Sequence, residues 1–180
     1  MERKRLLAQM AKEPTLHALT VLALSTAARA GELLNLDWAD VDLKERTLLF
    51  RLTKIDQPRA AWIHGEASRL ISQRAKVCDL QGRVFANSRG NRYNYAKRFK
   101  AACDAAKVAD FRFHDQRHSA ATYLAREGAT EQQLRAIGGW KSNVVNRYVH
   151  LAAVDAKQIT ERMNERILPT RRSKGLSRRP

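Results

Sequence analysis

The residues best suited to chemistry lie between positions 111 and 150. His114 and Arg117 stand three residues apart near the start of this stretch, and Tyr148 stands near its end. Residues at i and i+3 project from one face of a helix, so His114 and Arg117 would lie side by side. They offer a proton-transfer group next to a permanent cation with a rigid fork of donors. This pair suits a phosphate oxyanion, and a tyrosine hydroxyl brought back to it could attack that phosphate.

Composition indicates which phosphate this would be. The chain has 180 residues, enough for one full domain or a small domain with arms, and it carries 34 Lys and Arg against 18 Asp and Glu. The resulting charge of +16 favours a nucleic-acid backbone as partner, and a solvated basic surface is the alternative. Cys78 and Cys103 lack metal-ligand spacing and are expected to be reduced thiols. There is no signal-peptide pattern and no apolar run near the ~20 residues of a membrane span, so we expect a cytoplasmic protein.

Arg29 lies where two helices are expected to meet. The apolar pattern predicts a buried helix from Pro14 to about Ala28, and Gly31 is expected to end it before a second helix begins at Glu32. Glu32 could hold the Arg29 guanidinium in place. On the local sequence alone, an ordinary surface ion pair is the simpler interpretation.

Two short β-type runs, 47–53 and 59–64, flank a polar turn and predict a hairpin. Lys54 would lie at its tip, where it could reach a ligand above the sheet, although a turn lysine is usually just solvated. Helices are expected at 66–77, 93–108 and 114–127, and a capping box at Thr130 opens another. Ala120, Ala121, Tyr123 and Leu124 should pack inward. These elements predict a mixed α+β, mainly helical domain over residues 1–168 and a basic, disordered tail over 169–180.

Four segments match one family in the right order. They are the segment TAARAGE at 26–32, Thr53-Lys54 in the hairpin, HDQRH at 114–118, and Gly139-Trp140 followed by Tyr148. Together they resemble the catalytic domain of the tyrosine recombinase (phage integrase) family, with its T-G-x-R-x-x-E and H-x-x-R-H boxes. Each motif is weak alone, but their joint occurrence over roughly 120 residues is specific.

The resemblance implies a role for each matched residue. Arg29 and Arg117 would clamp the scissile phosphate, and Tyr148 would be the nucleophile that forms a 3′-phosphotyrosyl link. Lys54 would be the general acid for the departing 5′-oxygen, and His114 a hydrogen-bond or proton-transfer partner near Tyr148.

Four further positions follow from the same resemblance. Trp140 stands where many members have histidine, which limits it to binding and packing because an indole cannot take a proton. Glu32 would support Arg29, and His118 and His150 are expected to be structural. The implied partners are double-stranded DNA and further copies of the chain, as a homo-tetramer on DNA. No metal or other cofactor is expected, because no clustered carboxylates with ligand spacing occur.

Three departures from the family pattern stand out. Ala27 replaces the usual glycine of the first box, and Gln116 stands where leucine is common. The sequence also offers no room before Pro14 for the helical core-binding domain that members commonly carry. An isolated catalytic domain should bind DNA weakly and with steep salt dependence. Two alternatives stay open: a type IB topoisomerase-like enzyme, and a non-catalytic DNA-binding module derived from an integrase.

Overall fold

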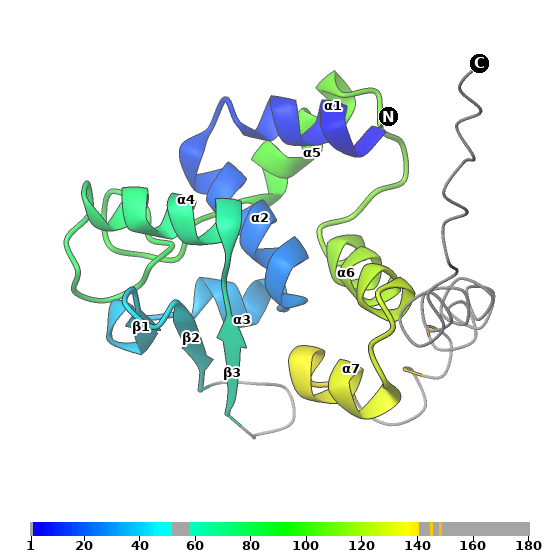
Figure 1. The fold of residues 1–180 in the computed structure, drawn as a ribbon. Coiled ribbons are helices and arrows are strands. Elements are labelled where there is room, and N and C mark those ends of the chain that lie inside the picture. The colour runs from blue at the N-terminus through cyan, green and yellow to red at the C-terminus, as the bar shows by residue number, and fades with distance from the viewer. Residues whose placement is uncertain (1, 52–57, 141–144, 146–147, 149–180) are drawn as a thin grey trace, which may run out of the picture.

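The computed structural model describes residues 2–51, 58–140, 145 and 148. In chain order the elements are α1 (Glu2–Met10), α2 (Pro14–Thr26), α3 (Ala30–Leu34), a 3₁₀ turn (Trp38–Asp40), β1 (Val41–Asp42), β2 (Thr47–Phe50), β3 (Arg59–Trp62), α4 (Gly65–Ala75), α5 (Ala96–Ala105), α6 (Asp115–Arg126) and α7 (Glu131–Gly138). This mainly helical fold with a small antiparallel sheet confirms the predicted fold class (Figure 1).

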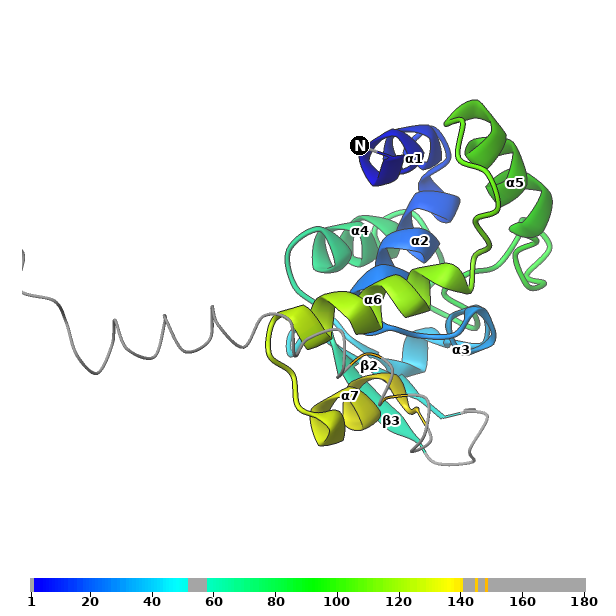
Figure 2. The ribbon, with the colours of Figure 1, turned by 90° about the vertical axis from the view of Figure 1, so that its right-hand side faces the viewer.

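Helix α2 is the centre of the fold. Pro14 occupies its first turn, where the missing N–H costs nothing, and Leu16, Leu19 and Leu22 are almost completely buried. The helix is apolar on nearly all sides, so it packs against both α4 and α6 (Figure 2). Through this packing α2 fixes where α6, the helix that carries Arg117, lies relative to the sheet.

The three strands form one antiparallel sheet in the order β1-β2-β3. Leu48 and Phe50 of β2 point into the core, and Phe50 lies directly opposite Arg59 of β3. Strand side chains alternate, so Arg59 and Ala61 share the inner face while Trp62 points out and is 64% exposed. The sheet therefore brings an arginine to an inward-facing position. The hairpin tip with Lys54 lies outside the described residues.

The predicted break at Gly31 is wrong. Helix α2 already ends at Thr26, Ala27 adopts a left-handed conformation with φ of 53°, and Gly31 lies inside α3. The Thr26 hydroxyl donates to the Leu22 carbonyl at 2.6 Å and accepts the Ala28 N–H at 3.3 Å, so a side chain satisfies the backbone at this end. A left-handed alanine costs roughly 1–2 kcal/mol, and glycine, usual in this box, avoids that cost.

Some of the other predictions from the sequence are confirmed and others are wrong. The capping box at Thr130 and the buried positions Ala120 and Ala121 are confirmed. The placement of Tyr123 in the core is wrong, because this residue is 44% exposed and its ring lies under the Arg3 guanidinium. No helix in the described part of the chain is long and apolar enough to cross a membrane. The predicted domain limits remain a prediction, and 169–180 lies outside the described residues.

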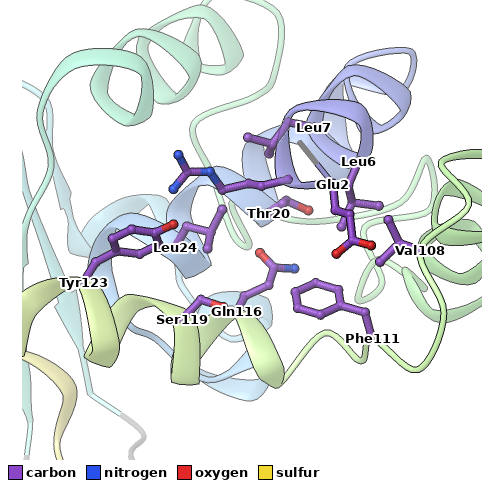
Figure 3. A pocket seen from close by; sticks show the side chains of 11 residues that line it. Glu2, Leu6, Leu7, Thr20, Leu24, Val108, Phe111, Gln116, Ser119 and Tyr123 are labelled. Atoms are coloured by element: carbon purple, nitrogen blue, oxygen red, sulfur yellow. The ribbon is translucent and has the colours of Figure 1, made fainter. Parts of the chain in front are cut away.

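Gln116 is buried beside a small cavity between α1, α2 and α6. The cavity has a volume of about 180 Å³ and mainly apolar walls that include Leu24 and Phe111. Figure 3 shows the Gln116 amide pointing toward Thr20. Among the described residues, neither the amide oxygen and nitrogen of Gln116 nor the Thr20 hydroxyl has a hydrogen-bond partner. Buried polar groups without partners cost stability, so this departure from leucine weakens the packing of α6.

We therefore predict that Gln116→Leu stabilises the protein. Replacing a buried, unpaired amide with an apolar side chain of similar size should raise the free energy of unfolding by about 2 kcal/mol. Urea unfolding followed by circular dichroism measures the change. Gln73→Leu is the matched control, because Gln73 is an exposed glutamine on α4 and its replacement should leave the midpoint nearly unchanged. A loss of stability in Gln116→Leu would contradict an unpaired amide.

Candidate active site

Arg29 caps helix α3 and is fixed by a carboxylate within that helix. Its Nη1 donates to Glu32 Oε1 at 2.7 Å, and its backbone N–H donates to Oε2 of the same carboxylate at 3.0 Å. The Arg29 side chain is 23% exposed, while that of Glu32 is only 2% exposed. The interpretation as an ordinary surface ion pair is therefore wrong: Glu32 is a buried anchor, and Arg29 reaches from it toward the solvent.

A second arginine shares this carboxylate. Arg59 donates from Nη2 to Glu32 Oε2 at 2.7 Å and from Nη1 to the Ile137 carbonyl at 2.6 Å. Its guanidinium carbon lies 4.6 Å from the centre of the Phe50 ring. Burial by itself would raise the pKa of Glu32, but Arg59 and then Arg29 outweigh it and hold this pKa below its usual value. Glu32 is thus ionised and holds two cations together.

Arg117 is buried on α6 and points to the same region. Its Nη1 donates to the Ala27 carbonyl, two residues before Arg29, and its guanidinium carbon lies 4.3 Å from the centre of the Trp140 ring. Its Nη2 has no hydrogen-bond partner in the described part of the chain. Burial first, and repulsion from Arg29 second, lower the pKa of Arg117 to about 9. An anion at this point would stabilise the charged guanidinium and so oppose both effects.

The corner Gly138-Gly139-Trp140 closes the site. Gly139 caps α7 with φ of 63°, and its carbonyl accepts from Arg29 Nη2 at 3.1 Å. A Cβ atom at Gly138 would lie 1.9 Å from the Trp140 ring, so only glycine lets the indole fold back over the helix end. The corner therefore contacts Arg29 through a carbonyl and Arg117 through an aromatic face.

Tyr148 lies against this corner. It is buried, its ring centre is 5.9 Å from that of Trp140, and its hydroxyl is hydrogen-bonded to Nδ1 of His118. The His114 ring packs edge-on against His118 with centres 5.0 Å apart. Burial first, and then the neighbouring His118 and Arg117, lower the pKa of His114, so this imidazole is neutral near pH 7. The hydroxyl of Tyr148 therefore faces an imidazole.

Comparison with known proteins identifies the family. A sequence profile described as the phage integrase family matches residues 2–154. The chain belongs to the phage integrase family. The integrase of Salmonella phage P22 is 32% identical in an alignment that covers 84% of this chain and 42% of the P22 protein. A shufflon-specific DNA recombinase of Escherichia coli is 29% identical over 144 residues, covering 79% of this chain and 36% of that protein. The chain thus spans less than half the length of these two relatives.

The fold agrees with this assignment. The catalytic domain of bacteriophage HP1 integrase superimposes with a TM-score of 0.70 at 22% identity, over 89% of this chain and 90% of that domain. XerA recombinase superimposes with a TM-score of 0.72 at 23% identity, over 93% of this chain and 62% of XerA. At such identities the likeness establishes the fold, and the evidence for the site comes from the residues of this chain.

Most predicted site residues of this integrase-family chain converge. Hydrogen bonds or ring contacts link Arg29, Glu32, Arg117, Trp140 and Tyr148 through the corner, and His114 joins them through His118. Lys54 and His150 lie outside the described residues. The sequence analysis missed Arg59 and treated His118 as structural. An arginine on the inner face of a predicted strand was the available signal for Arg59.

We predict that Glu32→Gln destabilises the fold in a pH-dependent way. Removing the buried charge that two arginines share should lower the free energy of unfolding by roughly 3 kcal/mol at pH 7. Because the folded-state pKa lies below the unfolded one, the stabilisation by Glu32 is complete above about pH 4.3 and disappears as the pH falls further. The difference between wild type and variant should therefore shrink on acidification.

Urea unfolding at a series of pH values between 3 and 7 measures this difference. Glu66→Gln is the control, because Glu66 also pairs with an arginine three residues away, Arg69, but on the exposed surface of α4. Water and salt screen that pair, so its loss should change the midpoint little. An equal response of the two variants would show that the Glu32 carboxylate does not organise the arginines.

Proposed function

We propose that this chain is the catalytic part of a site-specific DNA recombinase, which cleaves and rejoins DNA through a 3′-phosphotyrosyl intermediate. The observation that carries this proposal is the convergence of Arg29, Arg117 and Tyr148 on one corner of the molecule, from segments far apart in the sequence. By its name, the related Escherichia coli protein is a DNA recombinase. The charge of +16 suits the same polyanionic substrate.

The arginines would bind the scissile phosphate. Arg29 and Arg117 repel each other, and among the described residues only the Glu32 carboxylate pairs with the cations of this site. A phosphate between the two guanidinium groups would relieve that repulsion and take up their remaining donors. Since both groups are already held by main-chain carbonyls, at Gly139 and Ala27, they would stabilise the charge of the transition state without reorganising.

Tyr148 would supply the nucleophile. Its phenolic oxygen attacks the phosphorus, the bond to the 5′-oxygen breaks, and a 3′-phosphotyrosyl ester forms. The phenolic proton passes to Nδ1 of His118, the atom that its hydroxyl already contacts. Lys54 is proposed to protonate the departing 5′-oxygen. The reverse reaction rejoins the strand, because the ester keeps the phosphodiester energy.

The remaining site residues would position these groups. Trp140 covers Arg117 and packs against Tyr148, which fits a binding and packing role. His114 would keep His118 oriented through their ring contact and offer a neutral imidazole near the phosphate. Glu32 would hold Arg29. Strand exchange between two DNA sites requires several active sites at once, so we propose a homo-tetramer on DNA.

The first prediction for this function is a covalent protein–DNA adduct. Incubation with a nicked suicide duplex, from which the short fragment carrying the released 5′-hydroxyl diffuses away, should trap the 3′-phosphotyrosyl protein in denaturing gels. The adduct should form in EDTA, because guanidinium groups take the place of a metal, and it should be strongest at low salt. Mass spectrometry should locate the nucleotide on Tyr148.

Tyr148→Phe should abolish the adduct and leave salt-sensitive DNA binding in place, while Tyr123→Phe, which changes an exposed phenol, should behave as wild type. An adduct that persists in Tyr148→Phe would remove Tyr148 from this role. DNA binding without any adduct in the wild type would favour the non-catalytic alternative. Relaxation of one duplex without exchange between two would favour the topoisomerase alternative.

The second prediction tests His118 as the acceptor of the phenolic proton. In His118→Asn the amide can still hydrogen-bond to the phenol where Nδ1 stood, but it cannot take a proton. Loss of a general base should slow adduct formation by about 10²–10³-fold at pH 7. The rate of the variant should then climb steadily toward pH 10, because a free phenol ionises near that value.

Single-turnover cleavage rates between pH 6 and pH 10 make this measurement. His64→Asn is the control, because His64 is an exposed histidine that precedes α4. A uniform loss of rate at every pH in His118→Asn would show that His118 only packs against Tyr148. A wild-type rate would assign the proton to another acceptor.

A further inference from the structure

We propose that Arg59 is a positioning residue of the active site, which holds Glu32 so that Arg29 stays directed at the phosphate position. Neither the sequence motifs nor the similarity to known integrases and recombinases assigns a role to this residue. The inference rests on the proposed function, since it concerns the aim of an arginine that binds DNA phosphate.

The contacts of Arg59 join three separate elements. From the inner face of β3 it donates to Glu32 of α3 at 2.7 Å and to the carbonyl of Ile137, near the end of α7, at 2.6 Å. Its aliphatic stem lies 3.3 Å from the position that a Cβ atom would take at Gly139. Only 8% of the side chain is exposed, so these contacts are shielded from solvent.

These contacts complete a closed ring. Arg29 donates to Glu32, Glu32 accepts from Arg59, Arg59 is bound near the end of α7, and Arg29 is bound to the Gly139 carbonyl at that same end. The ring thereby connects β3, the N-terminus of α3 and the corner Gly138-Gly139-Trp140. A shift of any one element would stretch at least one of these short hydrogen bonds.

Sharing the carboxylate also decides where Arg29 points. A carboxylate and a lone guanidinium favour a bidentate fork, in which two parallel N–H groups face the two oxygens. Here Arg59 Nη2 and the backbone N–H of Arg29 both donate to Oε2, so the Arg29 side chain uses only Nη1 on Oε1 and keeps Nη2 on Gly139. Without Arg59, Glu32 could take both donors and turn the guanidinium away from the corner.

The same arrangement sets the charge of the site. Arg29, Arg59 and Arg117 with one ionised Glu32 leave two net positive charges around the corner. Removing Arg59 leaves one, and the Arg29 charge would then be neutralised by Glu32 alone. The turned Arg29 and the lost charge both weaken stabilisation of the transition state. Arg59→Met also leaves the buried Glu32 with fewer partners, so we expect lower stability, and cleavage must be compared where each variant is folded.

Arg74 is a matched control within the same chain. It is also partly buried, donates to a backbone carbonyl, that of Val84, at 2.6 Å, and lies over a phenylalanine, Phe85, at 5.3 Å. Its Nη1 also donates to the Thr15 hydroxyl at 2.9 Å, at the start of α2, whereas Arg117 of the site binds Ala27 at the end of that helix. Arg74→Met therefore reproduces the loss of a buried arginine with no change to the arginine–carboxylate ring.

The experiment compares Arg59→Met, Arg59→Lys and Arg74→Met in single-turnover cleavage of the nicked duplex at saturating protein. We expect Arg59→Met to slow cleavage by about 10²-fold, as misplacement of a catalytic group by about 1 Å does. The dissociation constant for DNA should change by less than about 10-fold, because the buried Arg59 side chain is not expected to contact DNA phosphates. Arg59→Lys keeps the charge but loses the fork, so its cleavage rate should lie between those of wild type and Arg59→Met.

Arg74→Met should cleave at the wild-type rate at any temperature where it is folded, although its urea midpoint falls. Equal cleavage rates for Arg59→Met and Arg74→Met would overturn the proposal. If Arg59→Met does not fold, Arg59→Lys decides alone: a wild-type cleavage rate in this variant overturns the proposal, and a reduced rate with normal DNA binding supports it.

A second readout does not depend on cleavage. In ¹⁵N NMR spectra, the side-chain N–H groups of Arg29 should exchange slowly in wild type and Arg74→Met, and faster in Arg59→Met or Arg59→Lys. Unchanged exchange in the Arg59 variants contradicts the positioning role even if the protein cleaves DNA. A wild type with slow exchange that depends on Arg59 but with no adduct would instead refute the proposed function and leave the ring intact.

Discussion

The site depends on one buried carboxylate. Burying Glu32 costs free energy that only close partners offset, and it finds them in the guanidinium groups of Arg29 and Arg59 and in the backbone N–H of Arg29. Because these partners come from a helix cap and a strand, satisfying the carboxylate brings α3 and β3 together. The lowered pKa of Glu32 records the outcome: the two cations stabilise its charge by more than burial destabilises it.

Backbone carbonyls at two helix ends hold the arginines of the site. Helices α2 and α7 both finish in a left-handed residue, Ala27 and Gly139, and the carbonyl of each accepts from an arginine of the site. Carbonyls at a helix C-terminus lack intrahelical donors and carry partial negative charge, so guanidinium groups suit them. The pairing crosses over: Arg29, which follows α2, binds the end of α7, and Arg117 of α6 binds the end of α2. Two backbone turns thus set the separation of the two cations.

Sequence patterns could predict the elements and the matched motifs, because helix periodicity, caps and hairpin turns are local properties. They could not predict which arginines share the Glu32 carboxylate. The i,i+3 spacing of Arg29 and Glu32 is also that of Arg69 and Glu66, which lie exposed on α4, and only burial separates the two cases. Arg59 could have been suspected from its inner-face position on a strand, but its bond to Ile137 joins residues 78 positions apart. The contact between His118 and Tyr148 was hidden for the same reason, since the chain must turn back over 30 residues to form it.

The electrostatics also explain why DNA would complete this site. Two guanidinium groups contact the Glu32 carboxylate, a third lies at the same corner, and burial with repulsion from Arg29 lowers the pKa of that third group, Arg117. The protein thus holds cations in a place where their charge is unfavourable until an anion arrives, and the buried Nη2 of Arg117 lacks a partner within the described residues. A bound phosphate would remove this cost, so the proposed DNA binding and the preorganisation of the site would have the same electrostatic origin. In the proposed reaction, phosphate binding would offset the free-energy cost of keeping the guanidinium groups together. The offset would be largest in the transition state, where the charge of the phosphate is greatest.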